Sequence, residues 1–341
     1  MENTYDKLID SDGQPHIGVF SRPVQNINYQ DFAYHTPMDR RGTRWEKHFA
    51  FNQFQFVGVC SEDLVFGCAL VDIKYIGNAF VYLYERASGN LREFSFMMPL
   101  GWRTHLSTTP DAGTSHFERG DIDFRLTSRN HPREKYLQIK VGKTLTADLT
   151  VTEPSDFQPL ALCTPTGFNG WTYTQKAAGL DVSGFVRLED RRYEFTNAHK
   201  GSYDWSCGFM RRETAWNWAC LSGKSEAGLT LGVNFANGVN ETSFTENAFW
   251  VDGRMTKVNQ IRFIYPKQRR HTQWRIESDD GKVKLRFEPE GARQEKLNLF
   301  VLATNFTQLF GRFYGTLVDD NGEVHTLNGV TGFAEDHYAK W

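Results

Sequence analysis

The sequence predicts a mainly β protein made of antiparallel strands, and three observations support this prediction. Apolar and polar residues alternate with a period of two along much of the chain, and tight-turn dipeptides separate the alternating runs. No stretch shows helical periodicity for more than about three turns. Phe, Tyr and Trp make up 14% of the 341 residues, which favours strands with large side chains facing either a packed core or a ligand cavity.

Alternation marks the strands of the first half of the chain. Ile122, Phe124 and Leu126, for example, alternate with Asp123 and Arg125. This pattern is typical of a half-buried antiparallel strand. Strands are expected at residues 47–59, 64–75, 80–85, 91–97, 122–127, 137–141 and 145–151.

Hairpins are expected in the second half. Asp252-Gly253, Asp280-Gly281 and Asn321-Gly322 each lie between alternating runs and supply the positive φ angles that tight turns need. Residues 306–318 and 323–327 should form one long hairpin. Residues 33–45 and 175–180 are expected to be irregular or short helix.

The segment 153–159 contains two prolines and does not alternate, so it is the best candidate for a linker. A chain of this length suggests about two domains. We therefore expect an N-terminal β domain over residues 1–153 and a C-terminal β-barrel domain over residues 160–341.

Composition excludes several classes of function. The net charge of −2 gives no electrostatic footprint for nucleic acid. Residues 1–15 are polar and acidic, so we expect no signal peptide, and no apolar window is long enough to span a membrane. The five cysteines form no CxxC pair, which favours free thiols in the cytoplasm. The sequence motifs of nucleotide-binding proteins, metalloproteases, serine hydrolases and kinases are absent, so we expect no cofactor and no metal. The sequence does not predict the oligomeric state.

The densest group of functional candidates lies in residues 204–223. Trp216 and Trp218 share one face of a strand, which forms either the wall of a ligand pocket or the core of a barrel. Arg212 has the same parity and either faces inward toward a carboxylate or is solvated at the strand end.

Residues 245–253 offer a candidate acid. Glu246 and Trp250 share one strand face, and Asn247 lies on the other, so only one of Glu246 and Asn247 should face a pocket. A carboxyl group in an aromatic pocket has a raised pKa and can act as a general acid. The alternative is a surface glutamate beside a turn.

Glu335 and His337 share parity near the C-terminus, with Asp336 between them. A carboxylate beside an imidazole suits acid–base chemistry. A metal site is a less favoured interpretation, and an orienting hydrogen bond within the last strand is a more favoured one.

Residues 168–184 follow the expected linker, where an interface between halves would form a pocket. Trp171 and Tyr173 alternate there, and Lys176 is either a buried cation paired with Asp204 or Glu246, or a surface lysine. Gln308, in the strand that starts at Phe306, is a further candidate for ligand binding.

Together, six segments resemble a bacterial family known as domain of unknown function 2804. They are RWEKHFAFN around Trp45, YTQKAAGLDVSG from Tyr173, RRETAWNWACLSG, ENAFWVDG from Glu246, FTQLFGRFYGTL from Phe306 and GFAEDHYAKW at the end. That family is more distantly similar to two-domain lipocalin-like (calycin) proteins such as carotenoid hydratases, terpenoid cyclases and decalin-forming Diels–Alderases. The resemblance implies two lipocalin-like β-barrel or sandwich halves packed together, with an apolar pocket in or between them. It transfers no catalytic residue.

The first hypothesis for function is binding of a hydrophobic small molecule of lipid, isoprenoid or polyketide type. The alternative is an enzyme that uses acid catalysis to hydrate, cyclise or isomerise an unsaturated lipid, and a scaffold protein without a cavity of roughly 300 Å³ is the third. The catalytic candidates are Glu246, Asp204, Glu335 and His337. The ligand-binding candidates are Trp171, Tyr173, Lys176, Arg212, Trp216, Trp218, Asn247, Trp250 and Gln308.

Overall fold

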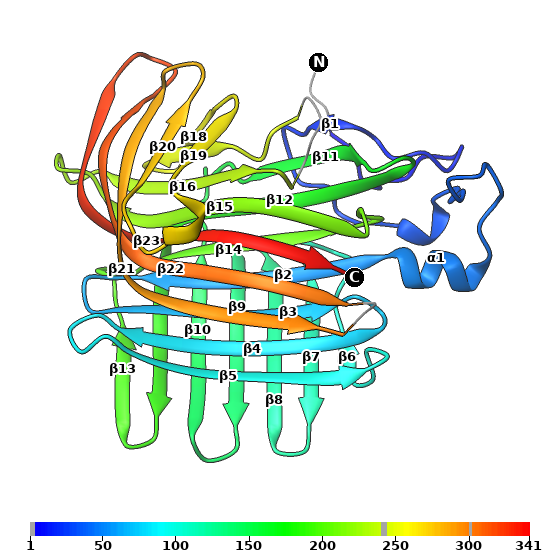
Figure 1. The fold of residues 1–341 in the computed structure, drawn as a ribbon, viewed down its shortest axis with the longest axis horizontal. Coiled ribbons are helices and arrows are strands. Elements are labelled where there is room, and N and C mark those ends of the chain that lie inside the picture. The colour runs from blue at the N-terminus through cyan, green and yellow to red at the C-terminus, as the bar shows by residue number, and fades with distance from the viewer. Residues whose placement is uncertain (1–3, 240–243, 300–301) are drawn as a thin grey trace.

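The computed structural model describes residues 4–239, 244–299 and 302–341 as two antiparallel β-sheets (Figure 1). The larger sheet has fourteen strands. Its main path runs through β5 (Asn90–Pro99), β4 (Ile76–Glu85), β3 (Leu64–Asp72), β2 (Asn52–Cys60), β14 (Lys200–Gly208), β12 (Gly170–Leu188), β10 (Leu145–Thr152), β9 (Arg133–Val141), β8 (Ile122–Asn130), β7 (Gly113–Arg119) and β6 (Thr104–His105). Three strands join it off this path: β1 (Gly18–Val19), β11 (Leu160–Thr166) and β13 (Arg191–Phe195).

The smaller sheet has nine strands, all from the C-terminal part of the chain. In spatial order they are β18 (Arg254–Lys257), β17 (Ala248–Val251), β16 (Thr230–Asn237), β15 (Glu213–Lys224), β23 (Val324–Lys340), β22 (Ala303–Val318), β21 (Val283–Asn298), β20 (Trp274–Ser278) and β19 (Ile261–Ile264). The helical elements of the described residues are α1 (Arg44–Ala50) and two 3-10 turns, Tyr29–Asp31 and Lys267–Arg269.

The predicted mainly β fold with antiparallel pairing is confirmed. The long hairpin is β22 paired with β23, and the turn at Asp252-Gly253, where both residues have positive φ, joins β17 to β18. Strand β10 shows why alternation was informative, because its residues alternate strictly between buried and half-buried.

Two local predictions were wrong. Residues 47–50, expected to begin a strand, are the end of helix α1. Thr43 accepts the Glu46 N–H and Glu46 accepts the Thr43 N–H, and this capping box starts the helix. Residues 175–180, expected to be irregular or short helix, lie inside β12. The alternation is lost there because consecutive residues 175–178 are all buried, so both faces of the strand are covered. The pairing also shifts register between Ala178 and Leu180.

Strand β12 connects the two parts of the larger sheet. Its first half pairs with β11 and β14, and its second half pairs with β10 and β13. In Figure 1, strands β7–β10 run steeply across the direction of β2–β5. Strands β2–β4 therefore lie between two layers, and nearly every residue of β2 and β3 is buried.

Two glycines bring the sheets into backbone contact beside the register shift. A Cβ on Gly232 would lie 2.1 Å from the carbonyl oxygen of Ala178, and one on Gly179 would lie 3.1 Å from the Gly232 nitrogen. The Ser222 hydroxyl accepts the Gly179 N–H at 3.0 Å and donates to the Gly201 carbonyl at 3.1 Å. Larger side chains would separate β12 from β16, so this contact sets how closely the sheets pack.

The predicted linker, residues 153–159, is irregular and connects β10 to β11. Both of these strands belong to the larger sheet, whereas the chain passes to the smaller sheet between Gly208 and Glu213. The division into domains at residues 153 and 160 stays a prediction. All five cysteines are free and buried. In the described part of the chain, no helix has the length and apolar character needed to cross a membrane.

Candidate functional site

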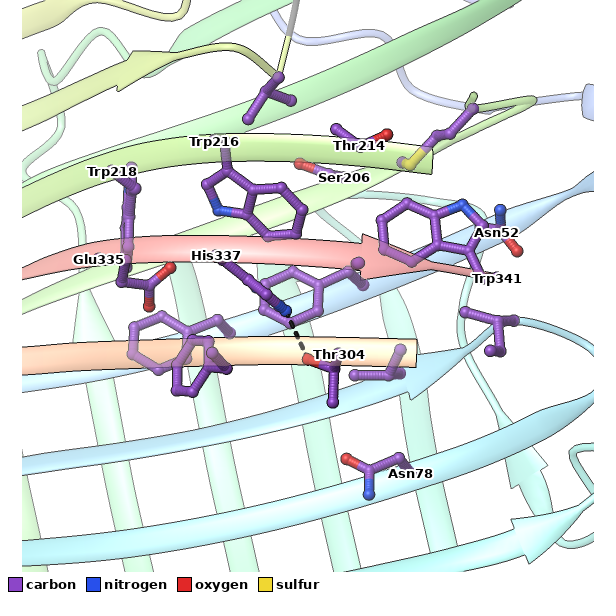
Figure 2. A pocket seen from close by; sticks show the side chains of 18 of the residues that line it. Asn52, Asn78, Ser206, Thr214, Trp216, Trp218, Thr304, Glu335, His337 and Trp341 are labelled. Atoms are coloured by element: carbon purple, nitrogen blue, oxygen red, sulfur yellow. Dashed lines mark hydrogen bonds between the residues drawn. The ribbon is translucent and has the colours of Figure 1, made fainter. Parts of the chain in front are cut away.

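A cavity of about 330 Å³ lies between the two sheets. One wall consists of β15, β21, β22 and β23 of the smaller sheet, and the other of β2, β3, β4, β12 and β14 of the larger sheet. Figure 2 shows Trp218 and Glu335 at one end of this cavity, Trp216 and His337 in the middle, and Trp341 and Asn52 at the other end.

Strand register arranges the wall of the smaller sheet in rows. Glu335 of β23 pairs with Trp218 of β15 on one side and with Gln308 of β22 on the other, and Gln308 pairs with Arg293 of β21. His337, two residues further along β23, pairs in the same way with Trp216 and Phe306. Because side chains two residues apart in a strand share a face, both rows face the cavity.

The opposite wall is polar on one side and apolar on the other. Lys176 of β12 pairs with Asp204 of β14, which pairs with Phe56 of β2. The aromatic rings of Phe54 and Phe80 also line the cavity. Charged groups therefore lie on β12 and β14, and aromatic rings cover β2 and β4.

Lys176 forms two buried ion pairs that join the sheets. Its Nζ lies 2.9 Å from an oxygen of Asp204 and 2.6 Å from an oxygen of Glu246, which precedes β17 of the smaller sheet. The ammonium group also lies 5.8 Å from the centre of the Trp218 ring. The sequence left open a surface lysine or a buried cation paired with either carboxylate; the structure pairs it with both.

Burial and the neighbouring opposite charges shift the pKa values of Lys176 and Asp204 in opposite directions. Burial alone lowers the pKa of Lys176, but attraction to Asp204 and Glu246 outweighs burial and the pKa is raised. Burial raises the pKa of Asp204, and the charge of Lys176 partly offsets this rise. Both carboxyl groups serve as partners of a buried cation. To act as an acid, either one would first have to carry a proton, and the loss of its negative charge would leave that cation poorly compensated.

Glu335 is a buried carboxyl group without a directly paired cation among the described residues. Its side chain accepts a hydrogen bond of 2.6 Å from the Gln308 amide. Burial raises its pKa to about 7, although the hydrogen bond from Gln308 and the charge of Arg293 act in the other direction. A carboxyl group with this pKa is protonated in a large fraction of molecules at neutral pH and can donate a proton.

His337 lies beside Glu335 but is not its partner. Its ring packs 4.1 Å from the ring of Trp216, and its Nε2 shares a hydrogen bond of 2.8 Å with the Thr304 hydroxyl (Figure 2). Burial, reinforced by the charge of Arg293, lowers the pKa of His337 to about 3. The imidazole is therefore neutral at physiological pH, and it offers hydrogen bonding without charge.

Arg293 was not predicted from the sequence. Its guanidinium lies 4.0 Å from the ring centre of Phe80 across the cavity, and its Nε donates to Glu93 at 2.5 Å. The signal that would have found it is the hairpin register, which places Arg293 directly opposite Gln308. This arginine connects the two walls at the same end of the cavity as Glu335.

The predicted site residues fall into two groups. Those that line the cavity are Asp204, Glu246, Glu335, His337, Lys176, Trp216, Trp218 and Gln308. Glu246 faces the cavity, whereas the Asn247 side chain bonds to the backbone of Ala236 and Asn259, which resolves the open choice between them.

The remaining candidates lie outside the described cavity wall. Trp171 and Tyr173 are buried in a separate cluster with Phe51 and Phe209. Trp250 packs on Phe157 and donates its indole N–H to the Gln158 carbonyl. Arg212 precedes β15 and is exposed. Their role in ligand binding stays a prediction.

One group of side chains in the described residues has the chemistry of metal ligands, and it lies in the turn between β22 and β23. It consists of Asp319, Glu323 and His325. Nε2 of His325 lies 3.0 Å from Asp319, whose other oxygen accepts the backbone N–H of Asn321 and Glu323. These contacts stabilise a tight turn.

Two packed antiparallel sheets with a cavity between them form a lipocalin-like fold. The sequence matches the family described as Domain of unknown function (DUF2804) over residues 2–341, and the chain belongs to this family.

Solved structures share the fold at low sequence identity. CghA with Sch210972 has a TM-score of 0.56 at 9% identity, covering 98% of this chain and 97% of that one. CghA alone gives a TM-score of 0.55 at 10% identity, with 98% and 96% covered. A structure described as AttH from Nitrosomonas europaea gives 0.50 at 14% identity, with 89% and 96% covered. No match is found among curated proteins.

The raised pKa of Glu335 predicts a specific pH dependence of stability. Since the folded-state pKa of about 7 exceeds the ordinary value of 4.5, the folded protein binds the proton more tightly than the unfolded chain. The free energy of unfolding should therefore fall as the pH rises from 4.5 to 7. Glu335→Gln should remove a decline of about 3 kcal/mol, as measured by urea unfolding across this range. Glu226→Gln, at an exposed position, is the control for loss of one carboxylate. Equal slopes for the wild-type protein and Glu335→Gln would contradict the assignment.

Proposed function

We propose that the protein binds an apolar small molecule, of lipid, isoprenoid or polyketide type, in the cavity between its sheets. The cavity itself is the observation that carries the proposal. Its volume of about 330 Å³ falls in the range of small-molecule sites, and rings of Phe54, Phe80, Trp216 and Phe306 form much of its wall. A scaffold protein, in which aromatic residues only fill a core, is disfavoured by a cavity of this size.

The polar groups at one end of the cavity would orient the ligand. The amide oxygen of Gln308 is buried and accepts no hydrogen bond from the described residues, although the amide nitrogen donates to Glu335. A hydroxyl group on the ligand would satisfy this oxygen. The hydrocarbon part of the ligand would then extend along Trp216 and Phe54 toward Trp341. CghA, a protein of the same fold, has been solved with the compound Sch210972, which supports a ligand-holding role for this architecture.

A cavity-filling variant tests binding directly. Ala339 lines the cavity and is buried, so Ala339→Leu should occupy part of the ligand volume. With the neutral fluorescent probe N-phenyl-1-naphthylamine, the dissociation constant should rise about tenfold, which corresponds to 1.4 kcal/mol. Ala87→Leu makes the same change at an exposed turn and should bind the probe like the wild-type protein. Equal affinity for all three proteins, or no binding by the wild-type protein, would contradict the proposal.

Acid catalysis is the second candidate function, and the environment of Glu335 favours it. Glu246 and Asp204 are also candidates for the acid, but both are partners of Lys176, whereas Glu335 combines burial with a pKa of about 7. The Glu335 carboxyl would transfer its proton to one carbon of an alkene as the π electrons form the new C–H bond. The faces of Trp216 and Trp218 would stabilise the resulting cation.

The cation would be resolved in one of three ways. Water adds and then loses a proton, a second double bond attacks to give a cyclic cation that then loses a proton, or a neighbouring C–H loses its proton to give an isomer. In each case the Glu335 carboxylate would recover a proton. These outcomes correspond to hydration, cyclisation and isomerisation.

Deuterium labelling tests this step. Geranylgeraniol incubated with the protein in D2O should gain carbon-bound deuterium, detected by mass spectrometry, because protonation forms a new C–D bond. Glu335→Gln should lose the labelling while it still binds N-phenyl-1-naphthylamine. If the wild-type protein binds the probe yet labels geranylgeraniol no faster than buffer does, acid catalysis on an isoprenoid alkene is excluded.

A further inference from the structure

An exposed apolar surface lies beside one end of the cavity. We call it the mouth patch and define it by Trp45, Tyr75, Met97, Leu100 and Trp102, whose exposed fractions are 72%, 44%, 40%, 70% and 66%. It includes half of the ten large apolar residues that are exposed in the described part of the chain. Scattered exposure of single apolar residues is ordinary, but a concentration of this kind marks an interaction surface.

Direct contacts connect Trp45, Tyr75 and Leu100 of the mouth patch. The Trp45 ring stacks on Phe49 of the same helix at 6.4 Å, and Phe49 stacks on Tyr75 at 4.7 Å. The Leu100 N–H donates to the Tyr75 carbonyl at 2.7 Å, and Trp102 follows in the same turn. Helix α1 and the ends of β3 and β5 lie together in Figure 1, next to the C-terminus of β23.

The mouth patch is also continuous with the cavity wall. Met97 belongs to both, and Ile73 and Ile76, on either side of Tyr75, line the cavity as well. An apolar molecule that leaves the cavity at this end therefore meets an apolar surface rather than open water.

Basic residues outnumber acidic ones in the segments that carry the mouth patch, although the chain carries a net charge of −2. Two of the basic residues are ion-paired within these segments, Arg40 with Glu46 and Lys74 with Asp72. Residues 38–49, 72–76 and 97–105 contain six lysines and arginines against three carboxylates. The basic residues are Arg40, Arg41, Arg44, Lys47, Lys74 and Arg103, and the acidic ones are Asp39, Glu46 and Asp72. The Arg103 guanidinium lies 5.4 Å from the Trp102 ring, so charge and aromatic surface are adjacent.

We propose that the mouth patch docks on a lipid surface with acidic headgroups, from which an apolar ligand passes between the membrane and the cavity. Exposed tryptophans beside basic residues suit the interface of such a membrane, where indoles lie at headgroup depth and arginines meet phosphates. The purpose of this docking rests on the proposed function, whereas the docking itself rests on the exposed surface and its charge.

The same charges argue against a second copy of the chain as the occupant. Symmetric pairing through the mouth patch would bring the excess positive charge of one copy against that of the other, and like charges facing each other oppose association. Acidic lipid headgroups complement this charge.

Vesicle sedimentation with the full chain tests the proposal. The protein should sediment with phosphatidylcholine vesicles that contain phosphatidylserine, sediment much less with phosphatidylcholine alone, and be released by high salt. The double variant Trp45→Ser/Trp102→Ser should reduce the vesicle-bound to free ratio by about tenfold or more. Val324→Ser, at an exposed valine outside the mouth patch, is the matched control and should bind like the wild-type protein.

Three results would overturn the proposal. They are failure of the wild-type protein to bind the mixed vesicles, equal binding by the double variant, and light scattering that shows a wild-type dimer converted to monomer by the double variant. The last result would assign the mouth patch to self-association.

Probe binding separates this proposal from the proposed function. Trp45 and Trp102 lie outside the cavity wall, so the double variant should still bind N-phenyl-1-naphthylamine in the absence of vesicles. Loss of vesicle binding by the double variant with probe binding intact supports docking. Vesicle binding by a wild-type protein that does not bind the probe would contradict the apolar cavity function and leave docking supported.

Discussion

The buried ammonium group of Lys176 joins the two sheets of this protein. Lys176 belongs to the larger sheet, and its two carboxylate partners come from both sheets, Asp204 from β14 and Glu246 from the segment before β17. A cation removed from water is tolerated only when it is paired, so the sheets must keep the spacing at which both carboxylates reach it. Trp218 and Phe56 pack together at 5.7 Å beside this cluster. The rows of side chains beyond them form the walls of the cavity.

Burial affects each titratable group of the cavity differently because its neighbours differ. Lys176 stays charged because two carboxylates outweigh its desolvation. Glu335 has no directly paired cation among the described residues, and burial raises its pKa to about 7. The pKa of His337 is lowered to about 3 because the positive charge of Arg293 adds to the effect of burial. The cavity therefore contains a paired cation, a neutral imidazole and a carboxyl group close to its titration point. Among the described residues that line the cavity, Glu335 combines burial with a pKa near neutrality, as a proton donor at neutral pH requires.

Alternation and turn residues predicted most of the fold, because strands with one buried face leave a period-two pattern. The pattern failed where another interaction determined the conformation. Residues 47–50 were expected to begin a strand, but a capping box places them in a helix. The choice between Glu246 and Asn247 could not be made from parity, because residues 245–247 precede the strand rather than belong to it. Trp216 and Trp250 could not be distinguished from the sequence, because aromatic rings line both the cavity and the core. The packing of the two sheets places Trp216 in the cavity wall and Trp250 in the core.

The central claim is that the space between the sheets is a binding site for an apolar molecule rather than a packing defect. A crystal structure of the full chain with N-phenyl-1-naphthylamine tests it most directly. We expect the aromatic rings of the probe to lie between Trp216 of β15 and Phe54 of β2, with the Lys176 ion pairs intact. A probe bound only on the outer surface, or sheets packed so that the cavity is absent, would contradict it.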